Sequence, residues 1–229
     1  MPIKYENIVP WGRSYEEYVR MFDLSDADLS RKILSCGDGP ASFNSGMIKR
    51  GFTVASLDPI YQFTKEQLES RIKETYELVI EQTKGHMDRF VWTTFKTLEE
   101  LAQARMSAMS EFLHDYESGL TDGRYIYGEL PVLPYENKSF DLVLCAHFLL
   151  FYSENLSLNF HFESILEMCR VGKEVRIFPV LDLNANPSQY LNPVKEFVHS
   201  IGFTAEEVQV NYEFQKNGNR MLRIVEKQK

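Results

Sequence analysis

Apolar residues recur along this chain in two spacings, and each spacing predicts a different kind of element. Short runs that are apolar nearly throughout are typical of strands buried on both faces of a parallel sheet. Five such strands are expected, at Lys32–Cys36, Thr53–Leu57, Tyr125–Tyr127, Phe140–Ala146 and Val175–Val180. Apolar residues three and four positions apart predict helices between them, at Ala41–Arg50, Asn155–Arg170 and Tyr190–Ser200. This alternation predicts a doubly wound α/β domain.

Four helix starts also carry a capping signal, in which a hydroxyl accepts a helix N–H and an acid or amide three residues later reciprocates. The pairs are Ser14-x-x-Glu17, Ser25-x-x-Asp28, Thr64-x-x-Gln67 and Thr97-x-x-Glu100. Two of them fall within residues 61–124, a span several times longer than a crossover between parallel strands needs. We therefore expect one domain, residues 1–229, with residues 61–124 as a helical insertion that acts as a lid.

The C-terminal segment departs from the alternation. Val208–Gln215 alternates apolar and polar residues, Arg220–Glu226 is a second run typical of a strand, and Asn217-Gly218 lies between them. Two such runs joined by Asn-Gly predict an antiparallel hairpin. The sheet is expected to have seven strands and to be mostly parallel, with an antiparallel last strand.

The first predicted strand ends in a glycine turn, Gly37-Asp38-Gly39. Ligands of open α/β sheets bind beyond the carboxyl ends of the strands, and glycines there let a ligand approach the backbone. A helix that opened at Pro40 would also present free N–H groups. Asp58 ends the next strand about twenty residues on, where an acid accepts hydrogen bonds from ribose hydroxyls. The alternative is that Asp58 only caps the turn before Pro59.

These features indicate a nucleoside ligand but do not identify which nucleoside it is. Gly46 is followed by Met47, so the chain lacks the Gly-Lys-Ser/Thr of a triphosphate-binding loop. Ala41 occupies the place of the third glycine of a dinucleotide fold, which also tolerates alanine, so NAD stays open.

The composition and charge of the chain limit the kinds of partner that it is expected to bind. The net charge of −8 argues against nucleic acid, which requires clustered Lys and Arg. The longest uncharged apolar stretch, Leu142–Tyr152, is too short to cross a bilayer, and the N-terminus has no signal-peptide run, so a soluble cytoplasmic protein is expected. Cys36, Cys145 and Cys169 lie in apolar segments, which favours reduced buried thiols over disulfides or a metal site.

Three later segments complete a pattern: Gly128–Tyr135 (GELPVLPY), Lys138–Val143 (KSFDLV) and Glu167–Gly172 (EMCRVG). With Ile33–Gly39, Val54–Asp58 and the hairpin, they resemble the class I S-adenosylmethionine-dependent methyltransferases over nearly the whole chain except the insertion. The segments LSCGDGPASFN, DPIYQF and EVRIFP are similar to a bacterial group with no assigned substrate. The resemblance implies a Rossmann-like fold, S-adenosylmethionine as cofactor and methyl transfer to a small molecule.

The resemblance also implies roles for residues. Gly37 and Gly39 would line the methionine and ribose, Asp58 would bind the ribose hydroxyls, and Glu129 would meet the adenine edge. Ser35 stands where the family usually has an acid, which weakens the expected contact to the cofactor's amino group. The full expected cofactor set is Arg13, Ser35, Cys36, Gly37, Gly39, Asp58, Pro59, Ile60, Glu129, Leu130 and Ala146.

Two of the expected roles have plain alternatives. His147 is the candidate general base, because it follows the fourth strand, but it also fits a half-buried structural histidine. Arg13 would bind the methionine carboxylate, or it is an ordinary surface arginine. Two other functions stay open: an NAD-dependent oxidoreductase, and a regulatory protein that binds the cofactor without turnover.

Overall fold

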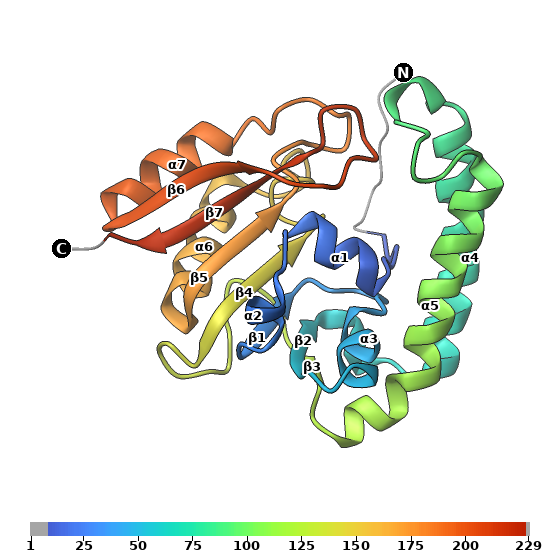
Figure 1. The fold of residues 1–229 in the computed structure, drawn as a ribbon, viewed down its shortest axis with the longest axis horizontal. Coiled ribbons are helices and arrows are strands. Elements are labelled where there is room, and N and C mark those ends of the chain that lie inside the picture. Colours follow the sequence, from blue (N-terminus) through green and yellow to red (C-terminus); the bar gives the residue numbers. More distant parts are fainter. Residues whose placement is uncertain (1–8, 228–229) are drawn as a thin grey trace.

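Seven strands form one sheet in the computed structural model, which describes residues 9–227 (Figure 1). The strands are β1 (Ile33–Cys36), β2 (Val54–Asp58), β3 (Tyr125–Tyr127), β4 (Phe140–Ala146), β5 (Gly172–Phe178), β6 (Phe203–Gln209) and β7 (Arg220–Glu226). Their order across the sheet is β3-β2-β1-β4-β5-β7-β6. Strand β7 is antiparallel to both of its neighbours, and the other adjacent pairs are parallel. The predicted Rossmann-like sheet, mostly parallel with an antiparallel last strand, is confirmed.

Helices cover both faces of this sheet. They are α1 (Tyr15–Met21), α2 (Asp26–Leu29), α3 (Phe43–Lys49), α6 (Leu158–Val171) and α7 (Leu191–Ser200). Helix α6 packs on β4 and β5 and α7 on β6, whereas α3 packs on β2 and α1. Successive strand residues enter opposite cores: Leu34 and Val143 pack with the α6–α7 side, and Ile33 with the α1–α3 side. This explains why the central strands are apolar throughout.

Between β2 and β3 the chain forms α4 (Lys65–Lys84), the short 3₁₀ turn η2 (Met87–Arg89) and α5 (Leu98–Thr121). Helices α4 and α5 pack side by side along one flank of the sheet, and α5 also contacts α3 and β3 (Figure 1). The capping boxes at Ser14, Ser25 and Thr64 are complete. At Thr97 the hydroxyl accepts the Glu100 N–H, but the Glu100 carboxylate accepts the N–H of Lys96 instead, so the expected reciprocal bond is absent.

Several predicted boundaries are wrong. Strand β6 is Phe203–Gln209 rather than Val208–Gln215, and it pairs with β7 from Phe203 opposite Glu226 to Gln209 opposite Arg220. Val210 and Tyr212 are buried in the α1–α3 core, so their alternation reflects side-chain burial in a connecting loop, residues 210–219. Strand β5 begins at Gly172 instead of Val175, and α3 begins at Phe43 rather than at Pro40, so no helix N-terminus lies at the glycine turn. No helix among residues 9–227 has the length and apolar character to cross a membrane.

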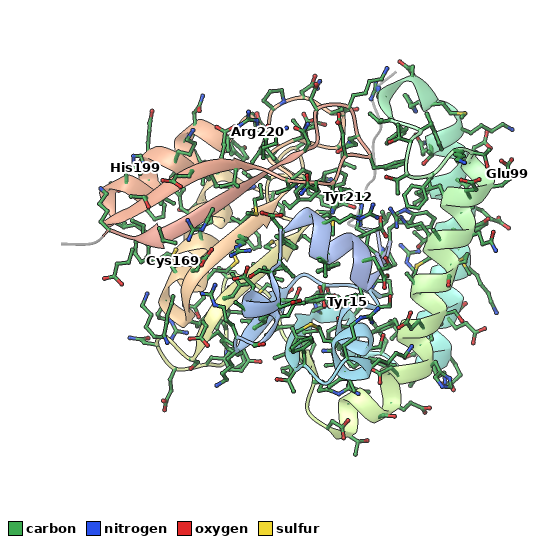
Figure 2. All side chains as sticks on the ribbon, viewed as in Figure 1. Tyr15, Glu99, Cys169, His199, Tyr212 and Arg220 are labelled. Carbon is green, nitrogen blue, oxygen red and sulfur yellow. The ribbon has the colours of Figure 1, made fainter. Side chains whose placement is uncertain are left out.

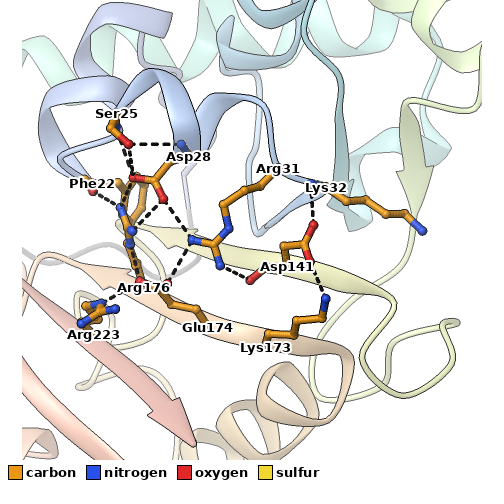
Figure 3. Close-up of polar contacts among 10 residues, drawn as sticks. All are labelled: Phe22, Ser25, Asp28, Arg31, Lys32, Asp141, Lys173, Glu174, Arg176 and Arg223. Carbon is orange, nitrogen blue, oxygen red and sulfur yellow. Dashed lines mark hydrogen bonds and ion pairs between the residues drawn. The ribbon is translucent and has the colours of Figure 1, made fainter.

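A partly buried ionic network joins α2 to β5 and β7 (Figure 3). The Glu174 carboxylate accepts hydrogen bonds from Arg176 Nε (2.9 Å), Arg223 Nε (2.7 Å) and Arg31 Nη1 (3.0 Å). Asp28 on α2 accepts from Arg31 and Arg176 as well. Burial raises the pKa of Glu174, but the hydrogen bonds from Arg223 and Arg176 outweigh it and bring this pKa down to about 2.

Glu174→Gln is expected to reduce the free energy of unfolding by about 1–2 kcal/mol at pH 7, because charge-assisted hydrogen bonds are replaced by weaker ones. A carboxyl whose pKa is lowered on folding stabilises the native state above its unfolded pKa and loses that contribution as the pH falls through the folded value. The difference between variant and wild type should therefore vanish between about pH 4.5 and pH 2. Urea unfolding at several pH values checks this. Glu69→Gln, in the exposed pair with Lys73, is the control and should change stability by less than about 0.5 kcal/mol.

Candidate functional site

A cavity of about 530 Å³ lies at the carboxyl ends of the central strands. The segments after β1, β2 and β4 line it, and so do Phe178 and Pro179 at the end of β5. Its volume is in the range of small-molecule sites. Ten expected site residues line it: Arg13, Gly37, Gly39, Asp58, Pro59, Ile60, Glu129, Leu130, Ala146 and His147. Ser35 and Cys36 do not; both are fully buried, and burial raises the pKa of the Cys36 thiol well above its usual value.

The glycine turn is shaped for close approach. Gly37 and Gly39 both have positive φ, 66° and 56°, which glycine adopts without strain. A Cβ at Gly37 would also meet the Phe148 ring at 2.9 Å, whereas a Cβ at Gly39 would meet nothing within 4 Å. The backbone of Gly39 is therefore accessible from the cavity.

Asp58 is bonded directly to this turn. Its carboxylate accepts the Gly39 N–H at 2.8 Å through one oxygen and the Ile60 N–H at 2.9 Å through the other. Burial raises the pKa of Asp58 to about 6 in spite of these two bonds. Asp58 thus caps the 3₁₀ turn η1 (Pro59–Gln62) and lines the cavity at once, and each oxygen keeps a lone pair for a ligand hydroxyl.

Asp38, between the two glycines, is a buried acid that sequence reasoning did not single out. Its carboxylate accepts hydrogen bonds from the hydroxyls of Tyr18, Ser35 and Ser56, and it lines the cavity. Burial raises its pKa. Ser35 therefore holds Asp38 in place from beneath the turn. The sequence signal that could have revealed this site was the pair Ser35 and Ser56, which the parallel register of β1 and β2 places side by side.

Arg13 is held beside the glycine turn. Its carbonyl accepts the Ser42 N–H at 3.0 Å, and a Cβ at Gly12 would meet the Pro40 carbonyl oxygen at 2.1 Å. The Arg13 side chain lines the cavity, with Nη1 donating to the Trp11 carbonyl and the enclosed Nε without a partner among the described residues. Burial and the neighbouring Arg105 lower the pKa of Arg13. This is a cation that lacks a full set of acceptors.

His147 follows β4 in a left-handed conformation, φ 49°, which its N–H to the Phe178 carbonyl stabilises. Its ring packs edge-on against Phe151 and Phe178, at centroid distances of 5.2 and 5.3 Å. Burial, with the nearby charge of Arg13, lowers the pKa of His147 well below its usual value, so the imidazole is neutral at pH 7. Nδ1 is enclosed and has no partner among residues 9–227, and His147 lines the cavity.

Two segments far apart in sequence close the cavity from above. The Val91 N–H donates to the Phe214 carbonyl at 2.7 Å, and the Lys216 N–H donates to the Arg89 carbonyl at 2.9 Å. The rings of Phe90 and Phe214 stack at 4.7 Å. The insertion and the loop 210–219 thus form one roof, and no sequence pattern paired these two segments.

A buried ion pair anchors the insertion below this roof. Arg105 on α5 donates through both terminal nitrogens to Glu17 on α1, and Tyr212 donates its hydroxyl to the same carboxylate at 2.7 Å. Figure 2 shows Tyr212 beside the end of α1, where the loop 210–219 passes over it. Burial raises the pKa of Glu17, but Arg105 outweighs it and brings this pKa to about 2. In the sequence, Glu17 is recognisable only as part of a capping box.

Comparison with known proteins places the chain among its relatives. No family model matches it. It is 35% identical over 224 residues to the uncharacterized protein MJ0045 of Methanocaldococcus jannaschii, an alignment that covers 97% of this chain and 98% of the relative. The chain belongs to the same family as this archaeal protein. The sequence had suggested a bacterial group, whereas this relative is archaeal.

Three solved structures with low identity are also similar. A TehB-like SAM-dependent methyltransferase from Corynebacterium glutamicum is 15% identical with a TM-score of 0.46, covering 86% of this chain and 81% of that one. Magnesium protoporphyrin IX methyltransferase from Synechocystis PCC 6803, with bound SAM, is 11% identical with a TM-score of 0.48, covering 93% and 78%. A protein from Pyrococcus horikoshii OT3 is 13% identical with a TM-score of 0.49, covering 93% and 91%.

Proposed function

We propose that this protein transfers a methyl group from S-adenosylmethionine to a small-molecule acceptor. The observation that carries the proposal is the hydrogen bond from the Gly39 N–H to the Asp58 carboxylate. It links the ends of two adjacent parallel strands on the wall of a ligand-sized cavity. Ligands of such sheets bind at this place, and an acid after the second strand suits ribose hydroxyls. The ordered motifs of the sequence support the same function.

The residues present fit this cofactor. Asp58 would accept hydrogen bonds from the ribose hydroxyls, and Glu129 and Leu130 would meet the adenine edge. The incompletely partnered guanidinium of Arg13 would bind the methionine carboxylate, which explains why a cation is held there. The bound cofactor supplies a methyl group already activated on a sulfonium. The protein's task is then to align the acceptor, to exclude water and to receive a proton, for which His147 is the candidate base.

S-adenosylhomocysteine is expected to bind the purified protein at pH 7.5 with one site per chain. Isothermal titration calorimetry measures this directly, and NADH serves as the contrasting ligand, because an oxidoreductase on a related sheet would prefer it. Tight NADH binding without S-adenosylhomocysteine binding would contradict the proposal. Cofactor binding with no methyl transfer to a broad acceptor library would instead favour a regulatory protein.

The affinity for S-adenosylhomocysteine is expected to depend on pH through Asp58, whose pKa is about 6. The charged carboxylate is the better acceptor for ribose hydroxyls, so protonation weakens binding. Affinity should be constant above about pH 7 and should fall about tenfold per pH unit below about pH 6. Calorimetry at pH 7.5, 6 and 5 measures the slope. An affinity that stays level down to pH 5 would show that the charge of Asp58 does not contribute.

A further inference from the structure

The cavity continues past the proposed cofactor site, and its continuation is aromatic. The strand order places the ends of β4 and β5 and the loop 210–219 on the side of β1 away from Asp58. Aromatic side chains that line the cavity come from these elements and from the insertion, which stacks on the loop: Phe90, Phe151, Phe178, Tyr212 and Phe214. This half of the cavity is where a methyl acceptor would lie, so the inference rests on the proposed function.

Two polar side chains at this end of the cavity are engaged by the protein itself. The Tyr212 hydroxyl donates to Glu17, and the Gln215 amide donates to the carbonyls of Asp182 and Leu183. Glu17 is neutralised by Arg105, and the charge of Arg13 is assigned to the cofactor's carboxylate. The neutral ring of His147 is not engaged in this way, since its enclosed Nδ1 has no hydrogen-bond partner within residues 9–227.

We propose that the methyl acceptor is a small phenol, a flat aromatic ring whose hydroxyl donates to His147. Aromatic walls favour an aromatic ligand, since paired rings stabilise each other beyond the area that they bury. A cationic acceptor would find no uncompensated carboxylate in this half, and an anionic one would find its cation already bound. A neutral hydroxyl donor satisfies the imidazole, with the ring's proton on Nδ1 and Nε2 accepting.

The transfer balances with these groups alone. The phenol oxygen forms a bond to the methyl carbon while the carbon–sulfur bond breaks, and its electron pair stays on sulfur, which becomes a neutral thioether. The phenolic proton passes to His147 Nε2 and then to solvent. The products are an aryl methyl ether, S-adenosylhomocysteine and one proton.

The test measures binding to protein saturated with S-adenosylhomocysteine, by ligand-observed NMR with three probes of similar shape. These are 4-methylphenol, 4-methylcyclohexanol, which lacks the aromatic ring, and toluene, which lacks the hydroxyl. The Kd of 4-methylphenol is expected to be at least about tenfold lower than that of either other probe, from ring contacts and one hydrogen bond together.

Two variants assign the site. Phe214→Leu should raise the Kd of 4-methylphenol about threefold to tenfold, while the affinity for S-adenosylhomocysteine stays unchanged. Phe162→Leu is the matched control, because Phe162 stacks on Phe197 with the same 19° interplanar angle as Phe90 on Phe214 but does not line the cavity. Asparagine tolerates the left-handed backbone at this position. His147→Asn should therefore weaken the binding of 4-methylphenol and leave the binding of toluene unaffected.

Each outcome decides between the two proposals. Equal binding of 4-methylphenol and 4-methylcyclohexanol would overturn the phenol assignment and leave the cofactor proposal intact. So would displacement of S-adenosylhomocysteine by 4-methylphenol, because both would then occupy one place. Failure of S-adenosylhomocysteine itself to bind would overturn both proposals.

Discussion

Asp58→Asn is expected to lower the affinity for S-adenosylhomocysteine by about 100-fold or more. The carboxylate has two tasks, since it would accept the ribose hydroxyls and it already accepts the N–H groups of Gly39 and Ile60. An asparagine amide nitrogen must face one of those two N–H groups in either orientation, so donor meets donor and the glycine turn loses a tie. Weakening of two charge-assisted hydrogen bonds, about 1.5–3 kcal/mol each when lost, is enough for the expected effect.

The same variant separates the ribose contact from the shape of the turn. The wild type should bind S-adenosylhomocysteine more tightly than its 2′-deoxy analogue, and Asp58→Asn should shrink this preference as well as the affinity. Asp23→Asn is the control, because Asp23 is exposed and its positive φ of 47° suits asparagine. A variant that binds both ligands weakly in an unchanged ratio would show that Asp58 only shapes the turn.

Much of the fold could be predicted because it depends on local patterns. Buried parallel strands are apolar on both faces, and the complete capping boxes at Ser14, Ser25 and Thr64 are set by side chains three residues apart. The expected places of the glycine turn and Asp58 also follow from the strand pattern. The turn follows β1 and Asp58 ends β2, and these two strands are adjacent in the sheet. Their proximity in the cavity required only the parallel pairing of β1 with β2.

What the sequence did not reveal depends on contacts between distant segments. Alternation in Val208–Gln215 indicated a strand, but strand pairing ends at Gln209, and beyond it Val210 and Tyr212 pack in the α1–α3 core while Phe214 stacks on the insertion. The partners of Asp38 come from α1, β1 and β2, and a carboxylate between two glycines is equally compatible with exposure. The Glu17–Arg105 pair joins residues 88 positions apart.

Arg105→Met is expected to reduce the free energy of unfolding by about 4 kcal/mol, because it breaks a buried ion pair. Both side chains of the pair are almost inaccessible, at 1% for Arg105 and 3% for Glu17, so the variant leaves a carboxylate buried with little compensation. Urea unfolding at pH 7 measures the loss. Lys73→Met on the exposed face of α4 is the control, with an expected change below about 0.5 kcal/mol.

The double variant Glu17→Gln/Arg105→Met tests whether the loss comes from the unpaired charge. Removing both charges should cost clearly less than the sum of the two single changes, because no buried ion remains alone. Arg13 gives the experiment a second readout. Its charge already acts on Glu17, so in Arg105→Met the carboxylate is expected to draw the Arg13 guanidinium away from the cavity. The affinity for S-adenosylhomocysteine should then fall in Arg105→Met and recover in the double variant. Equal affinities in these two variants would show that Arg13 serves the cavity independently of the ion pair.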